Sequence, residues 1–121
     1  MAEEIRLVDY FYVDVPDRPG EAARHLDALR RAGVNLLAFS GFPKGRRAQL
    51  DFVPEDPRAF RAAARAEKWK LVGPKKGFLI MGEDRVGALA DLLGRLAAQK
   101  INVTATDAVC AGPGRFGVIL W

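Results

Sequence analysis

Apolar and polar positions alternate along the chain in two patterns, one typical of strands and one of helices. Segments rich in aromatic and β-branched residues predict strands. Leucines and alanines that recur at i, i+3 and i+4 predict helices that bury one face. The expected strands are residues 9–15, 36–42, 48–53, 69–72, 77–82, 103–110 and 115–121. Three helices are expected between them, after residues 20 and 87 and over residues 57–67.

The helical patterns also predict which side chains pack on a sheet. For the first and third helices the expected inward residues are Ala23, Leu26, Leu29, Ala90, Leu93 and Leu96, and for the middle helix they are Phe60, Ala63 and Ala64. Asp56 followed by Pro57 predicts the N-cap and first residue of the middle helix. Pro19 is expected in the first turn of the first helix, where a missing N–H removes no hydrogen bond.

The four-residue motif Asp-Arg-x-Gly occurs twice, at residues 17–20 and 84–87, 67 positions apart. The same shift aligns ten identical pairs: 11/78, 17/84, 18/85, 20/87, 23/90, 26/93, 29/96, 35/102, 38/105 and 45/112. The chain is therefore a tandem repeat of a supersecondary module. The first copy reads βαββαβ, the ferredoxin-like order, and the second ends after βαββ. We expect an α+β fold with antiparallel sheets and packed helices, its first repeat in residues 1–74 and its incomplete second repeat in residues 75–121.

Composition excludes several classes of protein. Half of the 121 residues are apolar, yet no apolar run approaches the ~20 residues that span a bilayer, and the N-terminus lacks the features of a signal peptide. We expect a cytoplasmic protein without a membrane partner. One cysteine allows no internal disulfide or paired-cysteine metal motif, and we expect Cys110 to be a buried small residue. The single histidine, His25, is expected in a surface or boundary position.

The repeated motif also predicts a binding site. A strand that turns directly into a helix leaves backbone N–H groups free at the positive helix end, which suits a carboxylate. Gly20 and Gly87 place no side chain in the path of a ligand that approaches the backbone. Asp17 and Asp84 have two interpretations, as helix N-caps or as acceptors of the ammonium group of an amino acid.

The neighbouring polar residues leave alternatives open in the same way. Asn35 and Asn102 either adopt a left-handed turn conformation or offer a side-chain amide to a ligand. Arg18 and Arg85 either face solvent or contact the ligand.

Residues 13–40, VDVPDRPGEAARHLDALRRAGVNLLAFS, and residues 82–107, GEDRVGALADLLGRLAAQKINVTATD, both resemble the ACT domain, a small-ligand regulatory module of amino-acid biosynthetic enzymes. The resemblance implies that an effector, usually an amino acid, binds near the first strand-to-helix loop at an interface between paired units. The positions that match are Asp17, Arg18, Pro19, Gly20, Asn35, Asp84, Arg85, Gly87 and Asn102. The sequence departs from the family pattern at Val86, which replaces a proline, and in its truncated second copy.

The resulting hypothesis is a stand-alone regulatory protein that senses an amino acid and acts on a partner enzyme or regulator of amino-acid metabolism. The alternatives are an oligomerisation module without a ligand and a ferredoxin-like RNA-binding protein. Residues 115–121 are similar to the third-strand motif of RNA-recognition domains, but they lack its glycine, and residues 48–53 offer no aromatic platform. Nucleic acid is therefore disfavoured. We expect no catalysis, metal or cofactor, because no nucleophile with a base, carboxylate pair or metal cluster is recognisable.

The connection between the repeats limits how they join. Residues 73–77 are too short to cross a sheet assembled through the second strands of both repeats. We therefore expect residues 69–72 to lie close to residues 78–81, as a hairpin in which the first repeat's last strand serves both halves. Residues 36–42 and 103–109 would then be open sheet edges, which predicts a homodimer whose ligand site is completed between chains.

Overall fold

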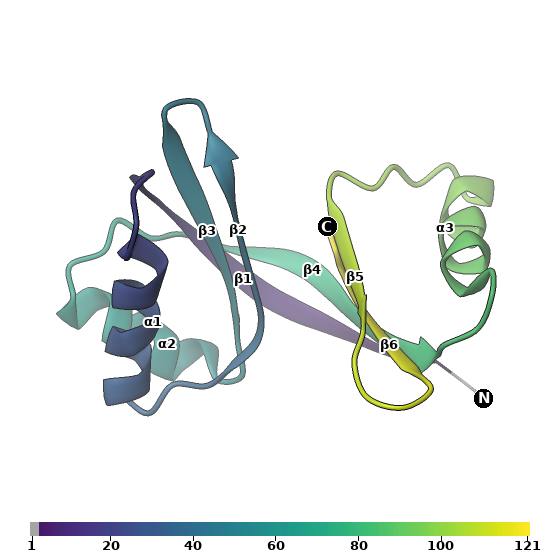
Figure 1. Ribbon diagram of the computed structural model, residues 1–121, viewed down its shortest axis with the longest axis horizontal. Helices are drawn as coiled ribbons and strands as arrows, with labels where there is room; N and C mark the ends of the chain where they lie inside the picture. The colour runs from purple at the N-terminus through teal and green to yellow at the C-terminus, as the bar shows by residue number, and fades with distance from the viewer. Residues whose placement is uncertain (1–2) are drawn as a thin grey trace. The chain divides into compact units, whose positions relative to one another are not determined.

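The computed structural model describes residues 3–121 and contains the three predicted helices (Figure 1). The predicted strands are present in part: those expected at 69–72 and 77–82 belong to one strand, and residues 69–71 and 103–105 lie outside any strand. The fold class is confirmed as α+β, with antiparallel strands and ferredoxin-like βαββαβ order in the first repeat. The elements in chain order are β1 (Glu4–Pro16), α1 (Glu21–Arg31), β2 (Leu36–Lys44), β3 (Arg47–Pro54), α2 (Pro57–Ala66), β4 (Val72–Glu83), α3 (Ala88–Ala98), β5 (Thr106–Cys110) and β6 (Arg115–Leu120).

The chain forms two compact units that share its two longest strands. The first unit is Asp9–Lys75, and the second unit contains residues 3–8 together with Lys76–Trp121. The strand order is β2-β3-β1-β4-β6-β5, so β1 and β4 are neighbours and each contributes a segment to both units. In the second unit, residues 4–8 of β1 lie beside β4, at the sheet position that a fourth strand occupies in a complete βαββαβ module.

The connection between the repeats differs from the expected hairpin. Residues 72–83 form one continuous strand, so the five residues 73–77 lie inside β4 and do not form a turn. The hairpin is therefore wrong, and the strand that takes the missing fourth position of the second unit is β1 and not the first repeat's last strand. An unbroken strand beside β1 offers hydrogen-bond partners to backbone groups that a turn would leave to water. The two strands expected at the edges, β2 and β5, are the edge strands of the sheet.

The core of the first unit is aromatic. Phe11 of β1 lies opposite Phe52 of β3, and Phe60 of α2 packs over both, with ring centroids 5.0 Å from Phe11 and 5.3 Å from Phe52. The predicted start of α2 is confirmed, because the Asp56 carboxylate accepts hydrogen bonds from the backbone N–H groups of Arg58 and Ala59. This cap positions Phe60 on the inner face of the helix.

His25 contradicts the expectation of a surface or boundary residue. The residue is only 4% exposed, its Nδ1 lies 2.8 Å from the backbone oxygen of Glu21, and its ring centroid lies 4.6 Å from that of Trp69. His25 is therefore part of the packing between α1 and the segment that leads into β4.

The core of the second unit is smaller and mostly aliphatic. It contains Ile80, Ala88, Leu92, Phe116, Val118 and Leu120. The predicted inward faces of α1 and α3 are partly wrong, because Ala23 and Ala90 are exposed, whereas Leu26, Leu93 and Leu96 are half-buried and Leu29 is buried. Both helices begin immediately after a glycine, so the inward positions are the first helical residue and those four and eight residues later.

No helix in residues 3–121 is both long enough and apolar enough to cross a membrane.

Candidate ligand-binding site

The two Asp-Arg-x-Gly loops have the same backbone conformation. Gly20, with φ 86° and ψ −9°, is the N-cap of α1, and Gly87, with φ 84° and ψ 4°, is the N-cap of α3. An L-residue in this left-handed region is strained by roughly 1–2 kcal/mol. Conformation alone therefore accounts for a glycine at both positions, and each helix starts without a side-chain cap.

The N-cap interpretation of Asp17 and Asp84 is wrong, because the capping position belongs to the glycine three residues later. Pro19 likewise precedes the N-cap and does not lie in the first helical turn. At the second loop, Ala88 N–H donates to the oxygen of Arg85 and Asp91 N–H donates to the oxygen of Gly87.

The intervening amides of α3, those of Leu89 and Ala90, have no hydrogen-bond acceptor among residues 3–121. Amides in the first turn of a helix point out of its positive end. Two donors therefore remain free for an external anion beside the second loop.

A cavity of about 340 Å³ lies at this second loop. Its lining includes three of the predicted site residues: Asp84, Arg85 and Gly87. The remaining lining comes from the first turn of α3, from residues 108–110 of β5 and from Phe116. The cavity is therefore lined by the aspartate, the glycine and the two residues that carry the free helical amides of the second repeat.

Cys110 is a residue of this cavity that the sequence did not indicate. The prediction that it is buried is wrong: its side chain is exposed, and Sγ donates a hydrogen bond to Oδ2 of Asp84 over 3.2 Å. The hydrogen bond to Asp84 and the negative charge of that carboxylate raise the pKa of the Cys110 thiol. The thiol is therefore harder to ionise than an ordinary cysteine, and in its protonated form it donates to the Asp84 carboxylate.

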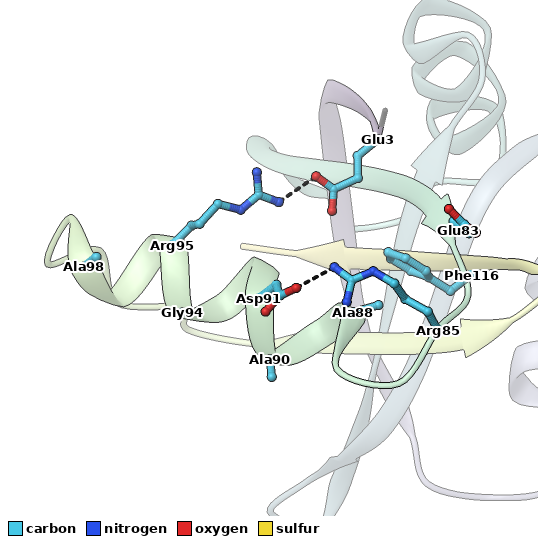
Figure 2. A pocket seen from close by; sticks show the side chains of 10 residues that line it. All are labelled: Glu3, Glu83, Arg85, Ala88, Ala90, Asp91, Gly94, Arg95, Ala98 and Phe116. Atoms are coloured by element: carbon cyan, nitrogen blue, oxygen red, sulfur yellow. Dashed lines mark hydrogen bonds and ion pairs between the residues drawn. The ribbon is translucent and has the colours of Figure 1, made fainter. Parts of the chain in front are cut away.

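Arg85 extends from the same loop along α3 into a larger cavity of about 670 Å³. Figure 2 shows its guanidinium group directed at Asp91, with which it forms an ion pair. A second ion pair, between Arg95 and Glu3 at 2.6 Å, lies further along the helix. The charged groups of this larger cavity are thus largely neutralised by one another.

The first loop is arranged differently. Glu21, the first residue of α1, is buried and accepts hydrogen bonds from Arg18 at 3.2 Å and Arg24 at 2.6 Å. The hydrogen bond from Arg24 is the main reason why the pKa of Glu21 is lowered, with Arg18 contributing further. The carboxylate is therefore ionised near the positive end of α1, a place that Ala88 occupies on α3.

Asn35 and Asn102 lie beyond the far ends of their helices. Each helix has 11 residues and so is roughly 16 Å long. Asn35 donates to Oε2 of Glu55 over 3.3 Å and lines a separate cavity of about 400 Å³. Within each unit, the structure therefore does not bring the asparagine to the Asp-Arg-x-Gly loop. The left-handed interpretation is also wrong, since the positive φ values belong to Gly33 and Lys100.

Among residues 3–121, no group of three or more histidine, cysteine, aspartate or glutamate side chains could hold a metal ion.

No protein-family model matches the chain, and no curated protein matches it in sequence. Solved structures with the same fold do exist. Protein BT0572 from Bacteroides thetaiotaomicron has a TM-score of 0.85 at 17% identity, over 97% of this chain and 80% of that one. The regulatory subunit of aspartate kinase from Thermus thermophilus, in its ligand-free form, has a TM-score of 0.66 at 22% identity, over 96% and 85%.

The structure of aspartokinase α and β subunits has a TM-score of 0.67 at 16% identity, over 99% of this chain and 86% of that one. At these identities the similarity establishes the fold. The chain therefore has the fold of the ACT-domain regulatory proteins, as the resemblance of its two repeats implied.

Proposed function

We propose that this protein is a non-catalytic regulatory protein that binds a free amino acid in the 340 Å³ cavity at the second loop. The observation that carries the proposal is a pair of complementary groups in this cavity. The free N–H groups of Leu89 and Ala90 suit the carboxylate of an amino acid, and the Asp84 carboxylate suits its ammonium group. A zwitterion satisfies both ends, whereas a simple anion would meet Asp84 unfavourably.

The difference between the two loops supports binding at the second. Glu21 already places a carboxylate at the start of α1 and engages the Arg18 and Arg24 guanidinium groups, so an incoming carboxylate would compete with an internal one for the same positive groups. Ala88 leaves the corresponding place on α3 without charge. We therefore assign the ligand to Asp84, Arg85 and Gly87, and give the first loop, with Asp17, Arg18, Pro19 and Gly20, a structural role.

A homodimer is part of the proposal. The five residues of β5 are all exposed and form a sheet edge, and three of them also line the ligand cavity. A second copy that pairs along β5 would therefore border the cavity and could supply its Asn102 or Asn35. The aspartate kinase neighbour is a regulatory subunit of an enzyme, and a partner enzyme or regulator of amino-acid metabolism is the corresponding proposal for this chain.

The test is a screen of the common amino acids by thermal shift, followed by calorimetry on those that stabilise the protein. A ligand at 100 times its dissociation constant adds about 2.7 kcal/mol to the free energy of unfolding. Asp84→Asn should abolish the shift, and Asp17→Asn, the matched change in the first loop, should leave it intact. If no amino acid produces heat or a shift, or if Asp17→Asn abolishes binding while Asp84→Asn does not, the assignment is wrong.

The second candidate function is an oligomerisation module without a ligand, which the exposed edge strand β5 favours. Sedimentation of the ligand-free protein separates the two. A tight dimer that binds no amino acid supports the module, whereas a dimer whose stability rises with one amino acid supports the sensor.

A further inference from the structure

The exposed face of α2 carries a row of arginines that no acidic group neutralises. Arg58, Arg61 and Arg65, here called the arginine ridge, are all exposed, and their i, i+3, i+7 spacing places them on one side of the helix. Within residues 3–121, none of their guanidinium groups forms an ion pair or a side-chain hydrogen bond.

On the other two helices, arginines form ion pairs with acidic side chains. On α1, Glu21 pairs with Arg24, and Asp27 pairs with Arg30 and Arg31. On α3, Arg95 pairs with Glu3. The first unit also carries the whole formal net charge of +4, because basic and acidic residues are equal in number in the rest of the chain. The unpaired positive charge is thus concentrated on α2 and its unit.

Helix stability does not explain the ridge. Arg58 lies in the first turn, where a positive charge opposes the helix dipole, and this turn contains no acidic residue. Arg61 is three residues from Arg58 and four from Arg65, and like charges at these spacings repel one another. Arg65 lies in the last turn, where its charge favours the dipole, but Arg58 and Arg61 gain no such benefit. The ridge as a whole is therefore better explained by a partner that neutralises it.

The residues beside the ridge indicate what kind of partner fits. Ala59, Ala62 and Ala66 are exposed and form a second row, one position further along the helix from each arginine. Small side chains let another helix approach closely, and their methyl groups gain from burial against apolar side chains. A phosphate backbone gains nothing from alanine methyl groups. The guanidinium groups bind carboxylates in a planar, bidentate geometry.

We propose that this face of α2 docks an amphipathic helix of a partner protein, with carboxylates at i, i+3 or i+4, and i+7 and small apolar residues beside them. The surface lies on the helix that the second repeat lacks, so only the first unit offers it. Docking on α2 is independent of ligand binding at the second loop.

The test uses a displayed library of helical 20-residue peptides selected against the intact protein. We expect the enriched peptides to carry the acidic spacing next to alanine or leucine. The triple variant Arg58→Gln, Arg61→Gln, Arg65→Gln should weaken their binding at least tenfold. Circular dichroism should show that the variant folds, and its thermal shift with an amino acid should be retained if the ligand site is at the second loop.

A matched control removes the same charge elsewhere in the first unit. Lys44→Gln, Arg46→Gln, Arg47→Gln changes three exposed residues at the β2–β3 turn and should alter peptide binding less than threefold. Enriched peptides without acidic residues, equal losses in both triple variants, or no enrichment would overturn the proposal. So would oligonucleotides that bind through the ridge when no peptide does, since the partner would then be a nucleic acid.

Discussion

The most direct test of the second unit is the substitution Leu92→Ala. Leu92 is 4% exposed and belongs to a core of only six buried residues, whereas the adjacent Leu93 is half-buried and lies outside that core. Truncating a buried leucine removes its burial energy and leaves a cavity, which together cost about 2–5 kcal/mol. Leu93→Ala should cost much less, roughly 1 kcal/mol, because only part of its surface leaves water on folding.

Urea unfolding followed through the two tryptophans measures these losses in each unit. Trp121 lies in the second unit and Trp69 in the first, so a Trp69→Phe background reports the second unit and a Trp121→Phe background reports the first. Each alanine variant is compared with its own background, and the free energy of unfolding is extrapolated linearly to water. We expect Leu92→Ala to lower the midpoint of the Trp121 signal far more than Leu93→Ala does.

The reasoning would be refuted if Leu93→Ala were as destabilising as Leu92→Ala. A loss below about 1 kcal/mol in the free energy of unfolding for Leu92→Ala would also contradict it, because truncating a leucine in a well-packed core costs more than this. Either result would mean that α3 presents a different face to the sheet.

Four further outcomes follow from particular contacts. Gly87→Ala should destabilise the protein by about 1–2 kcal/mol in urea unfolding, since the left-handed conformation strains an L-residue. Arg58→Glu should raise the free energy of unfolding by roughly 0.3–1 kcal/mol, because a negative charge in the first turn of α2 favours the helix dipole. Asp84→Asn should speed alkylation of Cys110 by iodoacetamide at pH 8, because losing the carboxylate lowers the thiol pKa and increases the thiolate fraction. Ala88→Glu should prevent amino-acid binding in calorimetry, since it copies the internal carboxylate of the first loop.

Much of the fold could be predicted from the sequence because its signals are local. The Asp56-Pro57 pair marked the start of α2, and the repeated Asp-Arg-x-Gly motif located α1 and α3, although their N-caps are the glycines and not the aspartates. The side of α3 that packs on the sheet was less predictable, because Leu92 and Leu93 are adjacent and both apolar. The choice between them depends on a helix start at Ala88, which the left-handed φ of Gly87 determines.

The way in which the two repeats join was harder still to predict from the sequence. The segment Gly73-Pro74-Lys75-Lys76-Gly77 has the composition of a turn. In the structure these residues extend β4, because β1 is long enough to lie beside the whole strand. Pairing with a neighbouring strand overrides the local preference for a turn here, and the five residues alone do not predict that pairing.

The candidate site could likewise be predicted where the signal is local, and could not be predicted where it depends on the tertiary fold. The duplicated motif identified Asp84 and Gly87, which the structure places in one cavity, but the partner of Asp84 is Cys110, 26 positions away in sequence. The resemblance grouped an asparagine with the loop in each repeat, yet a helix of 11 residues separates the asparagine from the loop. Recurrence at a fixed offset therefore shows that a module is repeated, and does not show which of its residues meet.

The two loops also show how duplication can preserve a conformation while its chemistry diverges. Gly20 and Gly87 differ by only 2° in φ, so the backbone donors at the two helix starts are presented in the same way. The difference lies one residue later, where Glu21 supplies a buried carboxylate to α1 and Ala88 supplies none to α3. The positive end of α1 therefore has a buried carboxylate beside it, whereas the first turn of α3 has only the exposed Asp91, which Arg85 neutralises. Under the proposed function, the start of α3 is therefore the place where an amino acid would stabilise the second unit.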